Sequence, residues 1–323
     1  MPSDSQHSQL SFGARVRIIA NFQQLGVVAV IALLIILLSI FSPVFLSGRN
    51  ILNVLQQVST LGIVSMGMTV LMISGGIDLS VGATISVVAC VVAKMLKAGL
   101  PVGASIPAGF LLGVLIAGIN GSIAAYTRAA PFIITLGTMT MLQGVAVLIT
   151  KGFPVTNLGA RFEFLGMGSI LDIPLIVILF FVVTLVCFFI LKYLRVGRTA
   201  YAIGGNELTA YLAGIRVRRN KILFYLICGF LTALAAMVLA ARVSSAQATM
   251  GNGFELRSIG AVVIGGTPLT GGRGNVIGTL TGVLLLGIIA NGLNLLHVDP
   301  AWQYIATGGV IVLAVLIQEK RSR

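Results

Sequence analysis

The sequence predicts an all-α polytopic membrane protein with about ten transmembrane helices in two pseudo-repeated halves, and three observations lead to this fold class. First, 57% of the 323 residues are hydrophobic and only 9% are charged, whereas a soluble domain carries about 25% charged residues. Second, long apolar runs recur along the chain, and about 20 such residues let a helix cross the hydrocarbon. Third, a glycine-rich motif occurs once in each half.

The expected spans follow from the apolar runs, of which 27–46, 174–191 and 222–241 contain no charged residue. Backbone groups in lipid must bond within their own segment, so these runs predict helices, whereas a β-barrel would show alternating segments. The span 256–270 is short and rich in glycine, and it is included because it makes the number of spans even. The expected spans are 27–46, 52–73, 79–98, 102–125, 131–150, 174–191, 222–241, 256–270, 275–297 and 301–317.

Basic residues predict the orientation, since short cytoplasmic loops carry an excess of Lys and Arg. Seven lie in 192–221, two precede the first span and three follow the last. With ten spans, all three regions fall on the cytoplasmic side, while Lys94 and Lys97 are exceptions. The net charge of +13 is thus attributed to orientation and anionic lipid, not to nucleic acid. The predicted parts are a cytoplasmic segment 1–24, one transmembrane domain 25–318 and a cytoplasmic tail 319–323.

The glycine motif reads GGxxL[ST]xG at 75–82 and again at 265–272. Apolar segments interrupted by Gly or Pro at corresponding positions of two halves point to a transport site between repeats. Glycine also adopts backbone conformations that other residues resist. We therefore expect each motif to break a helix and to absorb conformational change. The expected break and gating residues are Gly75, Gly76, Asp78, Ser80, Gly82, Gly265, Gly266, Gly271 and Gly272.

Asp78 places a carboxylate at membrane depth, where a charge is costly and faces a partner or a polar cavity. A half-helix is expected to start near Leu79, so Asp78 is positioned to cap it by accepting backbone N–H bonds. Direct contact with a transported molecule is the alternative. The capping role is the favoured interpretation.

Neutral polar residues also lie within the apolar spans, and two roles stay open for each of them. They form hydrogen bonds between helices, or they line a wet pathway. A pathway of amides and hydroxyls suits an uncharged polyol such as a sugar. The candidate pathway residues are Asn53, Gln56, Asn120, Thr135, Gln143, Asn291 and Asn294.

The sequence gives no support for catalysis or for metal binding. Its two histidines, His7 and His297, belong to no set with catalytic or metal-ligand spacing, and the chain has no G-x-x-x-x-G-K-[ST] motif for binding ATP. We therefore expect a subunit that is not an enzyme and that holds no cofactor or metal of its own.

The segment 204–215, GGNELTAYLAGI, predicts a short amphipathic helix on the cytoplasmic side. An N-cap residue, an acidic first turn, apolar residues at i, i+3 and i+4 and a terminal glycine follow one another in the expected order. These residues are Asn206, Glu207, Leu208, Tyr211, Leu212 and Gly214. The apolar face either packs on the chain's own helices or fills a groove on a partner protein.

These motifs together resemble the permease subunit of bacterial ABC monosaccharide importers. The resemblance rests on SGGIDLSVG at 74–82, the GGN segment, GGTPLTGGRGNVIGTLTG at 265–282 and NGLNLL at 291–296. It covers about 25–318 and is closest to the ribose permease group, with its xylose, arabinose and galactose relatives. Pro268 departs from the Ser that ribose-type permeases commonly have, so local backbone shape and cargo identity are in question there.

The resemblance implies a type II ABC importer-like permease fold and a set of partners. Two permease chains, usually a homodimer, form the pore in the bacterial inner membrane, with both termini cytoplasmic. A cytoplasmic ATPase subunit binds ATP and Mg, and a periplasmic sugar-binding protein delivers the cargo. The helix at about 206–214, together with Gly205, then matches the coupling helix that docks on the ATPase.

Three other functions are weighed against this interpretation. The nearest is an ABC permease for another small solute, such as a branched-chain amino acid or an autoinducer sugar. An ion-coupled secondary transporter is disfavoured by the few acidic residues within the spans, and a membrane enzyme is disfavoured by the missing catalytic set.

Overall fold

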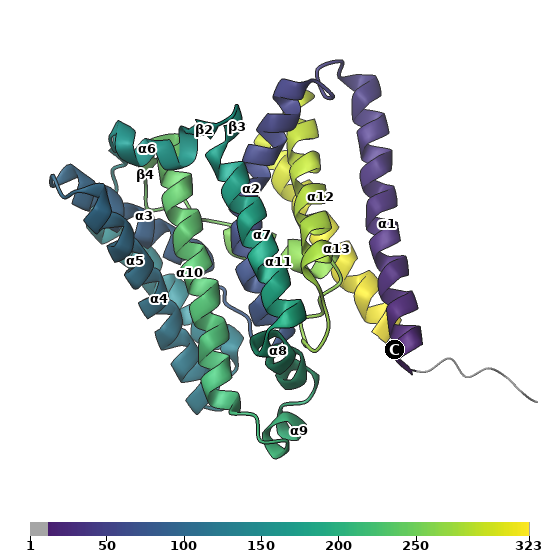
Figure 1. Cartoon of the computed structure of the whole chain (residues 1–323). Coiled ribbons are helices and arrows are strands. Elements are labelled where there is room, and N and C mark those ends of the chain that lie inside the picture. The colour runs from purple at the N-terminus through teal and green to yellow at the C-terminus, as the bar shows by residue number, and fades with distance from the viewer. Residues whose placement is uncertain (1–11, 323) are drawn as a thin grey trace, which may run out of the picture.

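The computed structural model describes the backbone of residues 12–322 and the side chains of residues 25–299, 301–314 and 316. This part of the chain is a bundle of helices with four short strands (Figure 1). The helices are α1 Phe12–Phe41, α2 Gly48–Ile73, α3 Val81–Lys97, α4 Val102–Tyr126, α5 Pro131–Thr150, α6 Ala160–Met167, α7 Leu175–Tyr193, α8 Arg195–Gly205, α9 Glu207–Leu212, α10 Val217–Val243, α11 Phe254–Ile264, α12 Val276–Leu295 and α13 Pro300–Ser322. The strands are β1 Val155–Thr156 and β4 Ser245–Ala246, which pair antiparallel, and β2 Ser169–Ile170 and β3 Ile173–Pro174, which also pair antiparallel.

A helix occupies each expected span, and two boundaries need correction. The span 27–46 is too long, because α1 ends at Phe41, just before Pro43, and a proline disfavours helical geometry in the residue before it. The span 256–270 is also too long, because Gly265 and Gly266 end α11 after Ile264. Cytoplasmic ends are predicted at 1–24 and 319–323, and the side chains of both segments lie outside the described residues.

Six helices within the described residues are long and apolar enough to cross a membrane. The chain is therefore a helical, polytopic membrane protein, while the number of ten crossings and the two-repeat layout stay predictions. The six helices are α2, α4, α5, α7, α10 and α12.

Helix α2 lies at the centre of the bundle, and every residue from 58 to 73 is buried. Neighbouring helices approach it where a small residue leaves room. Gly67 lies against the backbone of Cys228 in α10, Gly62 against the ring of Phe180 in α7, and Gly287 of α12 against Val58. In lipid, such close approach replaces the hydrophobic effect as a source of helix association.

Helices α4 and α10 pack in the same way, through small residues on both faces. A Cβ at Gly113 would lie 2.7 Å from Ala233 Cβ, and a Cβ at Gly121 would lie 2.8 Å from Tyr225 Cβ. Gly229 of α10 faces Ala117 of α4 at similarly short range. Helix α5 packs mainly on α3 and to a smaller extent on α4. It is largely exposed, as expected for a helix that faces lipid.

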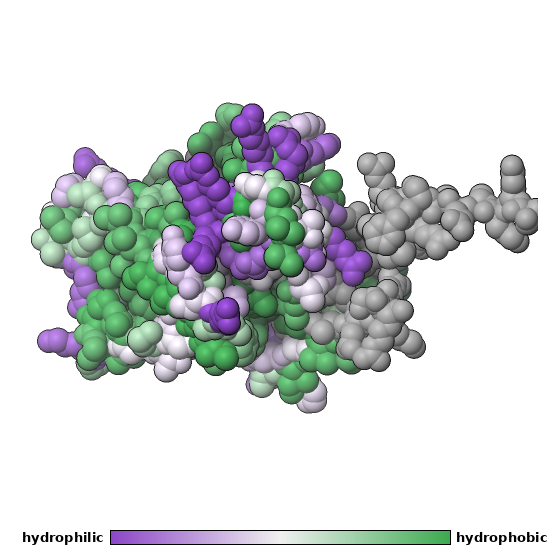
Figure 2. Space-filling view, turned by 90° about the horizontal axis from the view of Figure 1, so that it is seen from below, coloured by the Kyte–Doolittle hydropathy of each residue, from purple (hydrophilic) through white to green (hydrophobic). Residues whose placement is uncertain are grey.

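The two ends of the bundle differ. Helix α6 and strands β2–β4 lie at one end, and α8 and α9 lie at the other, together with the start of α1 and the end of α13 (Figure 1). Seen from the α8–α9 end, hydrophilic side chains gather over the middle and upper part of the face, with hydrophobic side chains to the left and below (Figure 2). Exposed basic residues of this end include Arg195, Arg198, Arg216, Arg218 and Arg219.

Candidate functional site

The segment predicted as an amphipathic helix forms α9, and both of its ends are where the sequence placed them. Asn206 Oδ1 accepts a hydrogen bond from Thr209 N at 2.8 Å, which caps the start. The helix stops at Gly214, which has φ +82°. There, Ile215 N donates to Ala210 O and Gly214 N donates to Tyr211 O, the hydrogen-bond pattern of a Schellman motif.

The apolar face of α9 points away from the rest of the chain. Leu208, Tyr211 and Leu212 are 67%, 66% and 75% exposed, whereas Ala210 is buried. Glu207 forms a 2.6 Å ion pair with Lys221 of α10, which helps to hold the helix in place. Of the two packings that the sequence allowed, the described residues do not provide a surface for this face.

Helix α8 precedes α9 and was not expected, because its basic residues are typical of a cytoplasmic loop. Its inward side is small and apolar: Gly197, Ala200 and Ile203 are buried. Tyr201 Oη donates to Gly274 O at 2.8 Å. Burial raises the pKa of the Tyr201 phenol, so this hydroxyl remains a donor at neutral pH.

Three glycine-containing backbone segments meet at the end of α8, and we call this place the glycine junction. It comprises the end of α2, the end of α8 and the loop between α11 and α12. A single residue, Asn206, separates the junction from α9. The junction residues are Ile73, Gly75, Gly204, Gly205, Gly271 and Gly272.

The contacts at the glycine junction are between backbones. Gly272 N donates to Ile73 O at 2.9 Å. A Cβ at Gly204 would overlap the same carbonyl oxygen, and a Cβ at Gly271, which has φ +82°, would lie 2.7 Å from Gly75 N. No side chain fits between these segments, so the end of α8 lies directly against the backbone of both glycine motifs.

The first motif ends α2 and then turns the chain into α3. Gly75 has φ +82°, and the N–H groups of Gly76 and Gly75 donate to Leu71 O and Met72 O at 3.1 and 2.9 Å. This is again a Schellman motif. Further on, Gly82 in the first turn of α3 packs against the backbone of Gly251.

Asp78 lies in this break and is buried. Its Oδ1 accepts hydrogen bonds from Ser80 N at 2.8 Å and Ser80 Oγ at 2.6 Å. Asn120 Nδ2 donates to Ser80 Oγ at 2.9 Å, and Thr138 Oγ1 donates to Asn120 Oδ1 at 2.7 Å. Asp78 thus closes the turn before α3. This helix starts at Val81, two residues later than the start expected near Leu79, and its N-cap residue is Ser80. A buried network links this turn to α4 and α5.

The second motif ends α11 in the same way as the first ends α2. Gly266 has φ +97°, and Gly266 N and Thr267 N donate to Val263 O and Val262 O at 2.9 and 3.1 Å. Gly265 packs directly on the backbone of Gly278 in α12. Within the two glycine pairs, the residue with positive φ is Gly75, the first glycine of the first motif, and Gly266, the second glycine of the second motif. The sequence alignment of the two motifs is therefore one residue out of structural register.

The loop after the second motif is also longer than the first, and its helix cap lies beyond the motif. Asn275 Oδ1 accepts a hydrogen bond from Gly278 N at 2.6 Å and caps α12. Pro268 opens a turn in which Gly271 N donates to Pro268 O at 3.1 Å.

Among the candidate pathway residues, three are buried and hydrogen-bonded within the bundle. Asn291 and Asn50 exchange two hydrogen bonds at 3.0 and 3.1 Å and join α12 to α2. Asn120 belongs to the Asp78 network, and Thr135 Oγ1 donates to Pro131 O of its own helix at 3.0 Å. Asn291 and Asn120 therefore form hydrogen bonds between helices, the first of the two roles that the sequence left open.

The other four candidates, Asn53, Gln56, Gln143 and Asn294, are exposed or half-buried. Asn294 Oδ1 accepts a hydrogen bond from Gln303 Nε2 at 2.6 Å. The seven residues do not converge on one place.

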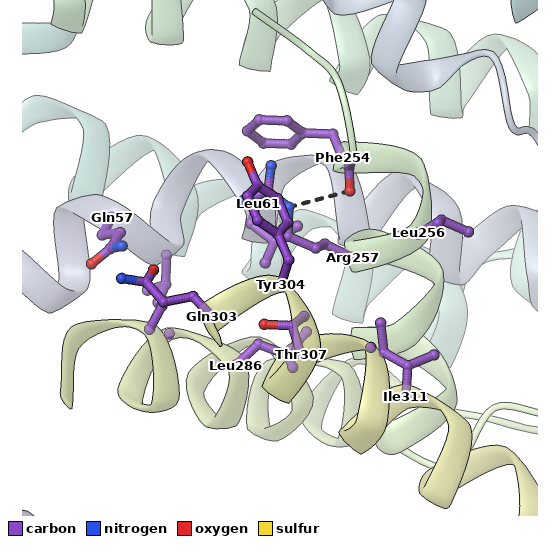
Figure 3. A pocket seen from close by; sticks show the side chains of 15 residues that line it. Gln57, Leu61, Phe254, Leu256, Arg257, Leu286, Gln303, Tyr304, Thr307 and Ile311 are labelled. Atoms are coloured by element: carbon purple, nitrogen blue, oxygen red, sulfur yellow. Dashed lines mark hydrogen bonds between the residues drawn. The ribbon is translucent and has the colours of Figure 1, made fainter. Parts of the chain in front are cut away.

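A cavity of about 300 Å³, which we call the Arg257 cavity, lies between α2, α11, α12 and α13 (Figure 3). Figure 3 shows Gln303 and Thr307 of α13 on the side facing α2, where Gln57 and Leu61 lie. The sequence singled out none of its α11 and α13 residues, because four distant segments form the cavity. One signal was available: Arg257 is a charged residue inside an expected span. The polar lining residues are Gln57, Arg257, Gln303, Tyr304 and Thr307.

Comparison with known proteins identifies the family. A family model described as branched-chain amino acid transport system / permease component matches residues 50–315. The ribose import permease protein of Bacillus subtilis (strain 168) is 42% identical over 302 residues, 93% of this chain and 94% of the relative. That of Escherichia coli (strain K12) is 41% identical over 304 residues, with the same coverage.

A further relative, the D-allose transport system permease protein of Escherichia coli (strain K12), is 34% identical over 300 residues, 92% of each chain. No solved structure gives a significant match. The family model covers the glycine motifs, α9 and the Arg257 cavity alike. The chain therefore belongs to the permease family described as branched-chain amino acid transport system / permease component.

Proposed function

We propose that this chain is the permease subunit of an ATP-driven bacterial importer for a monosaccharide, a ribose-like pentose or a related sugar. The observation that carries this proposal is the 41–42% identity, over 93% of the chain, to proteins named ribose import permease. The family description names branched-chain amino acids, which makes an amino acid the second candidate cargo. Identity to individual sugar permeases weighs more than a description that spans a whole family.

The proposed layout has ten crossings in two pseudo-repeated halves, two copies of the chain, and both termini in the cytoplasm. Figure 1 supports placing both termini on one side of the membrane, because the start of α1 and the end of α13 lie at the same end of the bundle as α8 and α9. Exposed basic side chains at that end agree with a cytoplasmic location. The protein is then located in the bacterial inner membrane.

The apolar face of α9 is the proposed contact with the partner ATPase subunit. A helix that buries its apolar face in a groove is a common mode of recognition, and Leu208, Tyr211 and Leu212 present such a face. ATP and Mg bind to the ATPase, and a periplasmic binding protein delivers the sugar.

The glycine junction supports a route by which ATP-driven motion reaches the membrane. When the ATPase subunits close, α9 moves with them, and α8 moves the ends of α2 and α11. Hinge motions require a few positions that absorb large changes in backbone angle, and Gly75 and Gly266 already hold the left-handed conformation. The permease halves then open alternately to each side.

The test is reconstitution of the permease with its ATPase and sugar-loaded binding protein in vesicles. Leu212→Ala is expected to reduce ATPase binding and ribose uptake at least tenfold, because most interface energy comes from a few buried anchors. Leu148→Ala is the matched control, since Leu148 is 79% exposed on α5 and far along the chain from α9. Equal uptake and equal ATPase binding in both variants would contradict the proposal.

A further inference from the structure

The Arg257 cavity lies near the middle of the bundle, measured along its helices. On α2, Gln57 and Leu61 lie about 14–20 Å from the start of a helix about 39 Å long, at 1.5 Å per residue. On α12, Leu286 and Ala290 lie about 15–21 Å along a helix of about 30 Å. The lining residues of both helices are thus at the depth of the bilayer centre, where transporters of this general kind hold their cargo.

The wall formed by α11 is a half-helix. The chain leaves α10 after Val243, passes through 244–253 without a helix and starts α11 only at Phe254. The residue before α11, Gly253, has φ +81°. Backbone that is not helical at membrane depth is tolerated where it is buried in protein or lines a polar cavity. Gly253 at the end of this segment lines the cavity, together with Phe254, Leu256 and Arg257 of α11.

Arg257 is fixed in the cavity wall by its own segment. Its Nε donates to Gly253 O at 3.2 Å, its Nη2 donates to Asn252 O at 3.3 Å, and its guanidinium lies 4.7 Å from the centre of the Phe254 ring. Among the described residues, no carboxylate forms an ion pair with it. A guanidinium has five N–H donors, so donors remain for a ligand in the cavity.

The nearby acid does not enter the cavity. Glu255 Oε1 accepts a hydrogen bond from Gly253 N at 3.1 Å, and its carboxylate lies against Gly82 of α3. This carboxylate offsets the positive charge of Arg257 and of the α11 N-terminus. The local charge balance therefore suits a neutral ligand with many oxygen atoms better than an anion.

The remaining lining offers hydrogen bonds together with apolar surface. Three half-buried side chains supply both donors and acceptors: Gln57, Gln303 and Thr307. Tyr304 supplies an aromatic ring, and Leu61 forms part of an apolar wall. Sugars present hydroxyl groups at their edges and C–H groups on their faces, which matches this lining. A volume of about 300 Å³ is at the lower end for ligand pockets, as expected for a small solute.

A polar strip leads from the cavity toward the end of the bundle opposite α9. Gln303 bonds to Asn294, and Asn53 lies one helical turn before Gln57 on the same face of α2. Tyr304 at the mouth is 76% exposed. Because an arginine at this depth is not stable against hydrocarbon, the mouth belongs on the side covered by the second copy and not on the lipid side.

We propose that the Arg257 cavity is a sugar-binding site midway through the membrane, in which Arg257, Gln303 and Thr307 hold the hydroxyl groups of a neutral monosaccharide during import. This inference rests on the proposed function and names the residues that contact the cargo. Arg257 is then a cargo-binding residue, and Asn53 and Asn294 lie on the route from the outer side.

The test uses the complete complex in vesicles, with D-ribose as the cargo. Arg257→Gln is expected to lower ribose uptake about ten- to hundredfold, the loss typical of a hydrogen bond to a charged group. ATP hydrolysis stimulated by the loaded binding protein should stay within about twofold, so that more ATP is used per sugar. Arg161→Gln is the matched control, because Arg161 is exposed on α6, and it should import normally.

A second measurement tests the proposed sugar site even if Arg257→Gln does not fold. In a chain without Cys90, Cys187 and Cys228, all of which are buried, Thr307→Cys is labelled with a small maleimide while the complex turns over. Ribose should slow this labelling at least threefold, whereas Arg161→Cys should be labelled equally with and without ribose. Full uptake by Arg257→Gln, or no protection of Thr307→Cys in a complex that imports ribose, overturns the inference and leaves the proposed function intact. Absence of import by the unaltered complex overturns both.

Discussion

Replacement of Gly204 by alanine tests the glycine junction. A Cβ at this position would lie 2.5 Å from Gly272 N and would overlap Ile73 O, whereas an ordinary contact begins at 3.4 Å. The end of α8 must therefore move by about 0.9 Å or more. This shift also separates the atoms of the hydrogen bond from Gly272 N to Ile73 O, which is 2.9 Å long.

The magnitude follows from these two effects. Overpacking of a tight interior costs about 1–3 kcal/mol, and a buried backbone group left without a partner costs about 1–3 kcal/mol. A total of about 2–6 kcal/mol lowers the melting temperature by about 3–9 °C for a chain of this size, because its entropy of unfolding is about 0.7 kcal/mol/K. Sugar-stimulated ATP hydrolysis should also fall, because α9 no longer moves together with the ends of α2 and α11.

Gly205→Ala is the matched control, since no atom lies within 4 Å of a Cβ at Gly205. An alanine there should leave the stability unchanged or raise it by about 0.5–1 kcal/mol. The assay is thermal unfolding of each purified variant in detergent, followed by ATP hydrolysis in the reconstituted complex. If the melting temperatures of Gly204→Ala and Gly205→Ala agree within error, the proposed packing of the junction is refuted.

Three further predictions concern the interior and α9. Asn120→Leu removes the hydrogen bonds that join Asn120 to Ser80 and Thr138, whose hydroxyls keep their bonds to Asp78 and Ile134. Thermal unfolding should show a loss of about 1–3 kcal/mol for the two bonds together, and a double-mutant cycle with Thr138→Val should show non-additivity; additive losses would contradict the network. Gly287→Ala overlaps Val58 and should destabilise by about 1–3 kcal/mol, and Val58→Ala added to it should restore part of the loss; no rescue would mean that the two residues are not in contact. Glu207→Gln removes a half-exposed ion pair and should change stability by at most about 1 kcal/mol, with an effect that disappears in high salt.

The sequence predicted the parts of the fold that depend on local pattern. Apolar runs located the long helices, and the cap signals at Asn206 and Gly214 located α9, because both depend on residues a few positions apart. Helix α8 was missed because only three of its residues, Gly197, Ala200 and Ile203, are buried, and the exposed Arg195 and Arg198 beside them are typical of a cytoplasmic loop. The ends of the first and eighth spans were misplaced, because apolar residues continue past Pro43 and because the residues that follow Gly266, 267–270, are uncharged.

The candidate site was predicted only in part, since it depends on contacts between distant segments. The sequence identified both glycine pairs but not that Gly204 packs against Ile73 and Gly272. It also identified polar residues in the spans, without indicating that Asn291 pairs with Asn50, and it did not identify Gln303, which lines the cavity. A buried amide and a cavity-lining amide have the same local sequence environment, so only the packing of the helices distinguishes them.

The most direct test of the account is the accessibility of Tyr211, because the proposed function requires α9 to meet an ATPase in the cytoplasm. Tyr211→Cys is placed in the chain without its three native cysteines and treated with a membrane-impermeant maleimide. We predict labelling in inside-out vesicles only, and protection when the ATPase subunit is bound, since the side chain is 66% exposed in the free chain. Labelling of intact, right-side-out membranes would contradict the orientation and the proposed contact with the ATPase.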